Sequence, residues 1–504
     1  MKIIKYAFAL GVIAVAMFVP FQKYYPGLDE SVYENIKIGF FMFAYFVVAI
    51  TPIIKTMDML SNKDIFEYNH VVVISTLAFL ALGQYMKAVL CMAIYGILYD
   101  LSYSLIRSVK EDIINRFDLG TNVVHMVVGE TKADVDIAQI EKGMNIVVNP
   151  GEKVPLDGYV VKGMAHVDMS PFCNDGGTMA VVPGAFVKSG VYVIDEKIEL
   201  EVKNDKKTCL TTRLFDNIKN ADVEISKTED EAITLSIILM VFFTVFSIGI
   251  MFLAPALGGF KNFKPWIIKG FSVMLMTCGI TMTSTAGISG LVGMYKCFRN
   301  GVYVKDENAL SKLARIRAVV FDVEMATHRF ASKAVMIAKS FGISKYAILS
   351  DANEGEVKRA GSLAGIDEGT CYGSLTMPEM FERLKSMDDF SPQLMFIGDY
   401  KTDSVMISRA SVGTACGLIE SNDDFMDFHS ASVISMKDDP VPLIENIKVA
   451  FEQERLTDGN IKLAILYKLA AIGLIMAGIL PIVTAMLIEI MLEVILIIRS
   501  TNIK

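Results

Sequence analysis

Hydrophobic residues are concentrated in eight long apolar stretches along this chain, most of them close to the length that a helix needs to cross a bilayer. This pattern predicts a multi-pass α-helical membrane domain of eight spans. The stretches lie at residues 3–20, 36–54, 70–83, 86–106, 233–254, 266–289, 462–479 and 481–498. The third and fourth stretches are separated only by Gly83, Gln84 and Tyr85, and the last two only by Leu480 and Pro481, so each pair is expected to form a hairpin.

A region of alternating apolar and polar residues, 120–205, follows the fourth stretch. Alternation with a period of two is typical of half-buried strands, and clusters of Gly, Pro, Asn and Asp mark the turns between them. Such clusters occur at Pro150-Gly151, at Asp157-Gly158 and at 174–177. The pattern therefore predicts a small all-β domain.

Three apolar runs after residue 300 each end in an acidic residue. Continuous runs of this length are typical of buried parallel strands, and open α/β sheets place their ligand-binding groups beyond the carboxyl ends of the strands. We therefore expect the three acids to meet at one edge of a sheet, although any single Asp there also fits a helix cap or a turn. The runs are 318–321 before Asp322, 346–349 before Ser350 and Asp351, and 393–397 before Gly398 and Asp399.

Composition narrows the class of protein. With 53% hydrophobic residues and a mean hydropathy of +0.45 over 504 residues, the chain is too apolar for an ordinary soluble protein. A net charge of −8 without a basic run argues against a nucleic-acid partner. The seven cysteines show neither a disulfide framework nor a Cys-x-x-Cys metal motif.

The charges that flank the apolar stretches indicate the orientation in the membrane. Basic residues flank the ends that the positive-inside rule assigns to the cytoplasm, and the first loop is acidic. We therefore expect a protein integral to the cytoplasmic membrane, with both termini and the soluble domains in the cytoplasm; Lys261 and Lys264 on the other side argue against this. Residues 2–20 lack a small-residue cleavage site, so they are interpreted as the first span rather than as a signal peptide. The basic residues are Lys2, Lys5, Lys55, Arg107, Lys110, Arg499 and Lys504.

The segment around Asp322 resembles the phosphorylation core of the P-type cation pumps. In that family the strand leads into Asp-Lys-Thr-Gly-Thr, whose Asp accepts a phosphoryl group from ATP, whereas Asp322 is followed here by Val-Glu-Met-Ala. Residues 148–158 resemble the actuator-domain signature of the heavy-metal branch. The Thr-Gly-Glu-Ser loop of that domain aligns with 173–176, which places Asp175 at the position of the Glu, although a plain β-turn also favours Asn-Asp-Gly-Gly.

The resemblance implies a minimal heavy-metal pump layout without the nucleotide-binding domain. Between Thr327 and Ser350 there is room for one helix, 331–342, where a pump carries that whole domain, so no recognisable ATP site is left. The implied order is transmembrane helices 1–4 in 1–119, an actuator-like β-domain in 120–230, helices 5–6 in 231–300, an α/β haloacid-dehalogenase-like (Rossmannoid) domain in 301–455, and helices 7–8 in 456–504.

The same resemblance implies roles for residues of the α/β domain. Asp322 would be the phosphoryl acceptor, and Asp399 and Asp403 would hold Mg²⁺. The lysine that offsets the phosphoryl charge in pumps is replaced by Phe381. The remaining candidates for contacts to the phosphate are Ser350, Asp351, Lys385 and Lys401.

Glu324 lies two residues after Asp322, the spacing at which soluble phosphatases of the dehalogenase class carry a general acid and base. The spacing is compatible with a membrane-anchored phosphatase that uses both residues. We favour the interpretation that Glu324 has no catalytic role and arose by sequence drift at a site that no longer catalyses a reaction.

Polar residues within the spans indicate a candidate ion pathway. The branch carries Cys-Pro-Cys where this chain has Cys278-Gly279-Ile280, and Lys468 falls where zinc and cadmium pumps place a lysine. A zinc-like divalent site would draw on Asp100, Glu489, Glu493 and Cys278; alternatively, Lys468 pairs with a carboxylate and only neutralises it. The glycines at 279, 287, 290 and 293 would break the helix or let it pack closely, and we favour packing.

Several motifs of the family have changed together, and we therefore favour a pseudoenzyme that binds a cation or a protein partner and does not pump by itself. The first alternative is an active cation-transporting ATPase phosphorylated at Asp322, with Mg²⁺ and ATP as cofactors. The others are the phosphatase and a regulator of a full-length pump.

Overall fold

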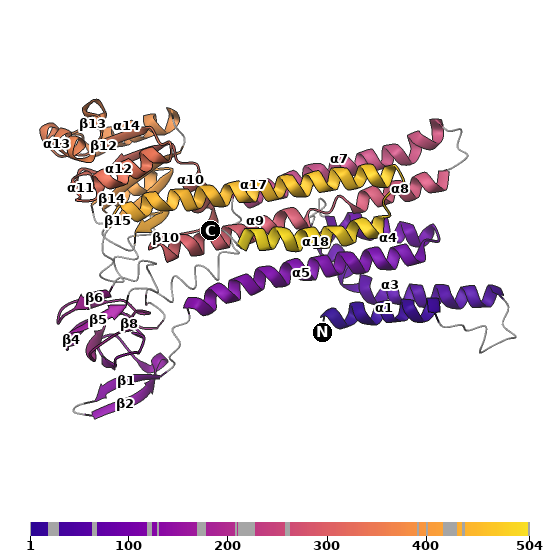
Figure 1. The fold of residues 1–504 in the computed structure, drawn as a ribbon, viewed down its shortest axis with the longest axis horizontal. Helices are drawn as coiled ribbons and strands as arrows, with labels where there is room; N and C mark the ends of the chain where they lie inside the picture. The colour runs from indigo at the N-terminus through magenta and orange to yellow at the C-terminus, as the bar shows by residue number, and fades with distance from the viewer. Residues whose placement is uncertain are drawn as a thin grey trace.

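The structure is a computed structural model that describes residues 2–18, 30–62, 68–117, 123–128, 131–168, 178–206, 209, 227–257, 263–390, 393–399, 402–416, 431–435 and 439–501. Long helices run side by side through one part of the molecule, and two smaller lobes lie beyond one end of them (Figure 1). One lobe is built of strands alone over most of its length, and the other is an α/β sandwich.

A helix forms at each of the eight apolar stretches. Five segments among the described residues are long and apolar enough to cross a membrane: Ser31–Ser61, Tyr85–Val109, Asp230–Leu257, Phe263–Arg299 and Val441–Met476. The chain is therefore an integral membrane protein. The helices are α1 (Lys2–Phe18), α3 (Glu30–Ser61), α4 (Tyr68–Ala81), α5 (Tyr85–Phe117), α7 (Lys227–Leu257), α8 (Phe263–Leu275), α9 (Ile280–Arg299), α17 (Val441–Met476) and α18 (Ile482–Thr501).

The sixth apolar stretch is divided into two helices. α8 ends at Leu275 and α9 begins at Ile280, with Gly279 as the residue before its first turn. Gly279 therefore stands at a break, and the favoured interpretation of the glycines as packing residues is also correct for it, because an added Cβ would come 2.6 Å from the Ser236 Cβ. The interpretation holds as well for Gly290 and Gly293, where an added Cβ would come within 2.5 Å of the Glu307 side chain and 2.6 Å of the Leu310 side chain.

The all-β lobe lies between α5 and α7 and contains two antiparallel sheets. Its larger sheet has the order β2-β1-β3-β9-β4-β7 and its smaller sheet the order β6-β5-β8. Asp157 is buried and accepts hydrogen bonds from the backbone N and the Oγ of Ser189, at 2.7 and 2.8 Å, so the turn that contains it is fixed to a second segment. The strands are β1 (Val123–Val128), β2 (Thr131–Asp136), β3 (Asn145–Val148), β4 (Gly158–Lys162), β5 (Ala165–Asp168), β6 (Thr178–Val181), β7 (Phe186–Val187), β8 (Tyr192–Val193) and β9 (Ile198–Val202).

The α/β lobe is built on a seven-stranded sheet with the order β10-β16-β15-β14-β11-β12-β13. The three strands expected from the sequence lie together and are parallel, because β11 pairs with β12 on one side and with β14 on the other. Alternate residues of β11 face opposite cores: Val320 is buried on one face, and Val319 and Phe321 are buried on the other. The strands are β10 (Val302–Val304), β11 (Ala318–Phe321), β12 (Lys345–Leu349), β13 (Cys371–Tyr372), β14 (Leu394–Asp399), β15 (Val412–Cys416) and β16 (Val433–Ser435).

Short helices connect these strands. Between Asp322 and β12 the chain forms only the five-residue α11 and the ten-residue α12, so this connection is as short as the sequence predicts. The helices are α10 (Glu307–Ala314), α11 (Val323–Thr327), α12 (Ala331–Ser340), α13 (Glu354–Ala364), α14 (Met377–Phe390) and α15 (Ser404–Arg409).

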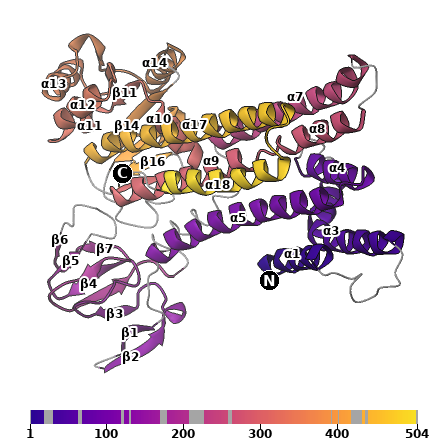
Figure 2. The same cartoon turned by 45° about the vertical axis from the view of Figure 1, so that its right-hand side comes forward.

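The long helix α17 connects the α/β lobe to the membrane part. α17 is 36 residues long and runs without interruption from the end of the sheet into the helical bundle, as Figure 2 shows. Arg315, at the end of α10, donates a hydrogen bond of 2.5 Å from Nε to Glu454 of α17. The sheet and the long helix are therefore tied to each other by a charged pair as well as by the chain.

Candidate functional site

Asp322 lies directly beyond β11 and forms the N-cap of α11. Its Oδ2 accepts a hydrogen bond of 2.8 Å from the backbone N of Glu324, and its own backbone N donates to the Ile397 carbonyl oxygen at 3.0 Å. The side chain is 8% exposed. Burial raises the pKa of the Asp322 carboxyl, and the neighbouring carboxylates of Glu324 and Asp351 raise it further. Both the cap interpretation and the expected position at the sheet edge are therefore correct for Asp322.

Asp399 and Asp403 approach Asp322 from the end of β14. Asp403 Oδ2 accepts a hydrogen bond of 2.9 Å from the Asp399 backbone N, which turns its carboxylate back toward the strand. Burial and then the Asp322 carboxylate raise the pKa of Asp403 to about 7. The strands thus bring the acid after β11 close to the two acids after β14, and Asp351 after β12 also acts on the Asp322 carboxyl.

The remaining residues predicted to contact phosphate are distributed around this edge. Ser350 is buried, and its Oγ accepts a hydrogen bond of 3.2 Å from the backbone N of Ala352, while Asp351 is exposed. Glu324 is exposed at the start of α11. Lys385 lies on the exposed face of α14. Asp175 and Lys401 lie outside the described residues.

The position at which the resemblance predicts a lysine is apolar. Phe381 packs against the core beneath α14, in the same cluster as Met380 and Leu384. The charged groups that act on Asp322 are acids, Glu324 and Asp351, and both disfavour a further negative charge. The groups that shift the pKa of the Asp322 carboxyl include no cation among the described residues. A phosphoryl group bound to Asp322 would therefore lie next to carboxylates.

The oxygen atoms at this edge suit Mg²⁺ chemically. Mg²⁺ is usually held by one or two carboxylates together with water and phosphate oxygens, and Asp399 and Asp403 can supply two carboxylates. Within the part of the chain that the structure describes, no group of three or more His, Cys, Asp or Glu side chains is arranged to hold a metal ion by itself.

A second polar cluster lies among the membrane helices, at the break between α8 and α9. The break leaves carbonyl oxygens without helical partners, and Lys468 Nζ of α17 donates to two of them, at 3.2 Å to Met276 and at 2.5 Å to Cys278. The same ammonium group donates to Glu489 Oε1 of α18 at 2.5 Å. Lys468 and Glu489 are both nearly inaccessible to solvent. The structure thus forms the neutralising pair that the sequence left as an alternative.

Glu493 lies one helical turn beyond Glu489 and is completely buried. Its Oε1 accepts hydrogen bonds from Ser102 Oγ of α5 at 2.7 Å and from Ser284 Oγ of α9 at 2.5 Å. Its Oε2 has no hydrogen-bond partner among the described residues. Neither serine was predicted from the sequence to contact Glu493. The signal for Ser284 is a row of hydroxyl residues along α9, at 281, 284, 285 and 289, spaced to lie on one helix face.

Asp100 takes a different place from the one expected. Its Oδ2 accepts a hydrogen bond of 2.8 Å from the Tyr6 hydroxyl of α1 and forms an ion pair of 3.7 Å with Lys5. Two residues along a helix differ by about 200°, so Asp100 faces away from the side of α5 on which Ser102 meets Glu493. The proposed grouping of Asp100 with Glu489, Glu493 and Cys278 is therefore not what this geometry favours. Cys278 lies in the break itself, buried beside Lys468.

The family described as P-type ATPase actuator domain matches residues 118–219. The cadmium, zinc and cobalt-transporting ATPase of Bacillus subtilis (strain 168) is 21% identical over 375 residues, which cover 72% of this chain and 53% of that protein. The protein of the same description from Helicobacter pylori (strain ATCC 700392 / 26695) is 22% identical over 423 residues, 81% of this chain and 58% of that protein.

Solved structures give the same relation at the level of the fold. The crystal structure of a zinc-transporting PIB-type ATPase in the E2.Pi state matches with a TM-score of 0.56 at 14% sequence identity, over 99% of each chain. In sequence, the chain spans a little more than half the length of the curated relatives described above.

Proposed function

This chain is a divergent relative of the heavy-metal P-type ATPases with an actuator domain of that family, and from this premise we propose that it binds a cation or a protein partner without pumping by itself. The proposal includes the finer architecture: eight membrane spans, and an α/β lobe of the haloacid-dehalogenase-like type whose Asp322 corresponds to the phosphoryl acceptor.

The observation that carries the proposal is the acidic environment of Asp322. Phosphoryl transfer depends on cations that offset the charge of the moving group, and removal of one such group typically costs several kcal/mol of transition-state stabilisation. Here the carboxylates of Glu324 and Asp351 raise the pKa of Asp322, and Phe381 replaces the lysine. An Asp in this environment is a poor acceptor for a group that already carries negative charge.

The short connection after Asp322 supports the same conclusion. The nucleotide-binding domain of a pump would have to lie between α11 and β12, where α12 occupies ten residues. Mg²⁺ at Asp399 and Asp403 is compatible with this proposal, because binding of the ion does not require turnover.

The cation that we propose for the membrane part is a divalent ion of zinc-like character. Glu489 and Glu493 supply carboxylates and Cys278 supplies the one thiol, so the donor set is mixed and harder than a two-thiolate site. Lys468 forms an ion pair with Glu489 in this structure, and this pair would have to separate before Glu489 could bind a metal ion.

We also propose that both termini and the two lobes lie in the cytoplasm. α1 begins and α18 ends on the side of each helix that is nearer to the two lobes, although the start of α1 lies further from them (Figure 1). This common side supports the orientation that the flanking charges predict.

The test is covalent labelling of purified full-length protein with γ-labelled ATP and Mg²⁺, in parallel with Asp322→Asn. We expect no acid-stable label that depends on Asp322. A label that forms on the parent chain and is lost in Asp322→Asn would show that Asp322 accepts a phosphoryl group from ATP and would overturn the proposal. An artificial phosphate ester, assayed with Glu324→Gln, tests the phosphatase alternative in the same preparation.

A further inference from the structure

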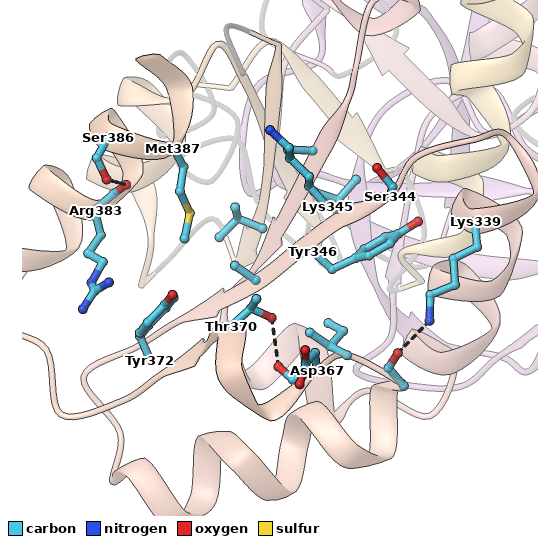
Figure 3. A pocket seen from close by; sticks show the side chains of 16 residues that line it. Lys339, Ser344, Lys345, Tyr346, Asp367, Thr370, Tyr372, Arg383, Ser386 and Met387 are labelled. Carbon is cyan, nitrogen blue, oxygen red and sulfur yellow. Dashed lines mark hydrogen bonds between the residues drawn. The ribbon is translucent and has the colours of Figure 1, made fainter. Parts of the chain in front are cut away.

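A cavity of about 540 Å³ lies in the α/β lobe, near the ends of the strands that are opposite to Asp322. It is bordered by the first residues of β11 and β12, by the loop after α13 and by the second half of α14. In Figure 3, Arg383, Met387 and Tyr372 lie on the left of the view, and Lys345, Tyr346 and Lys339 lie on the right. The volume lies within the range of about 300–1,000 Å³ that is usual for small-molecule sites.

The short strand β13 is one reason for the cavity. β13 pairs only with Ile348 and Leu349, so among the described strands none covers that edge of β12 at Tyr346. The backbone N of Ser350 donates to the Tyr372 carbonyl oxygen at 3.2 Å, which shows that the N–H groups of alternate residues of β12 point to this edge. The backbone N–H and C=O of Tyr346, four residues earlier, therefore point toward the cavity.

The packing of α14 is the other reason. Met380 and Leu384, on its inner face, are buried against the sheet. Arg383, Ser386 and Met387 border the cavity instead. The helix thus closes one side of the cavity without filling it.

The lining has an apolar floor and a basic border. Ala318, Val320 and Ala347 form a flat apolar surface on one face of the sheet. The Tyr346 ring lies on the other face of the sheet, where its hydroxyl donates a hydrogen bond of 2.6 Å to the Ile343 carbonyl oxygen. The Arg383 guanidinium lies 4.0 Å from the centre of the Tyr372 ring.

Two of the charged groups in the lining already have structural roles. Lys339 Nζ donates to the Gly365 carbonyl oxygen at 2.8 Å, and Asp367 Oδ1 accepts from the backbone N of Gly369 at 3.2 Å. Arg383 and Lys345 are exposed at the border. The charge that these two present to the cavity is positive.

We propose that this cavity binds a small organic anion with a flat unsaturated ring. The ring lies on the apolar floor of Ala318, Val320 and Ala347, and its anionic group binds Arg383 and Lys345. A guanidinium that is stacked on a tyrosine keeps its N–H groups free for a carboxylate or phosphate in the plane of the stack. The site is separate from Asp322 and does not depend on phosphoryl transfer.

Two sources share this chemistry, a nucleoside monophosphate and an aromatic carboxylate. We would therefore titrate the purified full-length protein with AMP in one arm and with salicylate in the other, by isothermal titration calorimetry. One of the two is expected to bind at micromolar to low millimolar concentration and to protect the backbone amide of Tyr346 from hydrogen exchange. Adenosine and inorganic phosphate, each of which has only half of the chemistry, are expected to bind at least about tenfold more weakly than AMP if AMP is the ligand.

Two variants test the geometry without disturbing the core. Arg383→Gln removes the charge and is expected to weaken binding at least about tenfold. Ser386→Trp places a ring in the cavity from an exposed helix position and is expected to abolish binding. The matched control is Arg359→Gln, an exposed arginine of α13 outside the cavity, which is expected to change nothing.

The proposal is overturned if neither anion binds at millimolar concentration, or if binding is unchanged in both Arg383→Gln and Ser386→Trp. Loss of AMP binding in Asp322→Asn would also overturn it, because that result places the ligand at the other end of the sheet. Covalent phosphorylation of Asp322 bears only on the preceding proposal, so the two can fail separately.

Discussion

At the scale of single residues, the acids beyond β11 and β14 determine how the α/β lobe responds to pH. The carboxylates of Asp322 and Asp403 repel each other when both are ionised. The repulsion is strong because both side chains are largely buried and no described lysine is among the groups that shift their pKa values. The strand pattern was sufficient to place Asp322, Asp351 and Asp399 at one edge, because adjacent parallel strands end on the same side of a sheet, whereas Asp403 was expected there only from the family resemblance.

Asp403→Asn removes one of these carboxylates, while the amide oxygen can still accept the hydrogen bond from the Asp399 N–H. A carboxyl with a pKa of about 7 binds a proton more tightly in the folded than in the unfolded chain. The parent protein therefore loses stability as pH rises from about 4 to about 7. We expect the variant to melt ~2–4 °C higher than the parent at about pH 8, with the difference vanishing near pH 4.

Scanning fluorimetry of the purified protein across this pH range is the measurement. Glu356→Gln, an exposed acid on α13, serves as the control and is expected to leave the melting temperature unchanged. An equal shift at both pH values would assign the effect to packing instead of charge.

Other residue contacts could not be predicted. Ser102 and Ser284 bind Glu493, yet hydroxyl residues in membrane helices serve equally well in packing, so a sequence does not separate the two uses. Asp100 was expected near Glu493 but bonds to Tyr6, because the position of α1 beside α5 depends on packing that the apolar pattern does not encode.

At the scale of elements, the most informative feature is the break between α8 and α9. The apolar pattern predicts one continuous span there, and the helix-breaking proline of the family is missing. The break nevertheless forms, and Lys468 of α17 satisfies its carbonyl oxygens while it pairs with Glu489. The spacing of hydrophobic residues does not predict this break, because Lys468, which binds its carbonyl oxygens, lies about 190 residues away along the chain.

Replacing only Lys468 or only Glu489 should leave one uncompensated buried charge, whereas replacing both leaves none. Lys468→Met leaves Glu489 buried with no cation, and Glu489→Gln leaves Lys468 without its carboxylate; each is expected to cost about 3–5 kcal/mol in the free energy of unfolding. The double variant should cost less than the sum by at least ~1 kcal/mol.

Unfolding of the detergent-solubilised protein, followed through a double-mutant cycle, measures this coupling. Lys462→Met is the matched control, because Lys462 is exposed on the same helix. Additive costs for the two substitutions would contradict the pairing.

At the scale of the whole molecule, the helical bundle and the two lobes were predictable in outline because each has its own hydrophobic period. Their contacts were not. The ion pair between Arg315 and Glu454, which joins the α/β lobe to α17, involves two charged residues that the sequence does not distinguish from other surface charges.

The orientation in the membrane can be tested with single cysteines. Lys305→Cys in the α/β lobe and Thr501→Cys at the end of α18 should react with an impermeant maleimide in inside-out vesicles and not in intact cells. Leu257→Cys, at the far end of α7, is 90% exposed and should show the opposite pattern. The described native cysteines are buried, and Cys173→Ser as a background removes the one that is not described. Labelling of Lys305→Cys from outside would reverse the topology.

The uninterrupted length of α17 has a mechanical consequence. At a rise of about 1.5 Å per residue, its 36 residues form a rod about 54 Å long, with Val441 at the sheet and Lys468 deep in the bilayer. A rotation of the sheet would therefore also rotate this helix. Rotation of the helix would move the Lys468 ammonium group away from the carbonyl oxygens to which it donates hydrogen bonds. A ligand that rotates the lobe would then be enough to separate Lys468 from Glu489 inside the bundle, without transfer of a phosphoryl group.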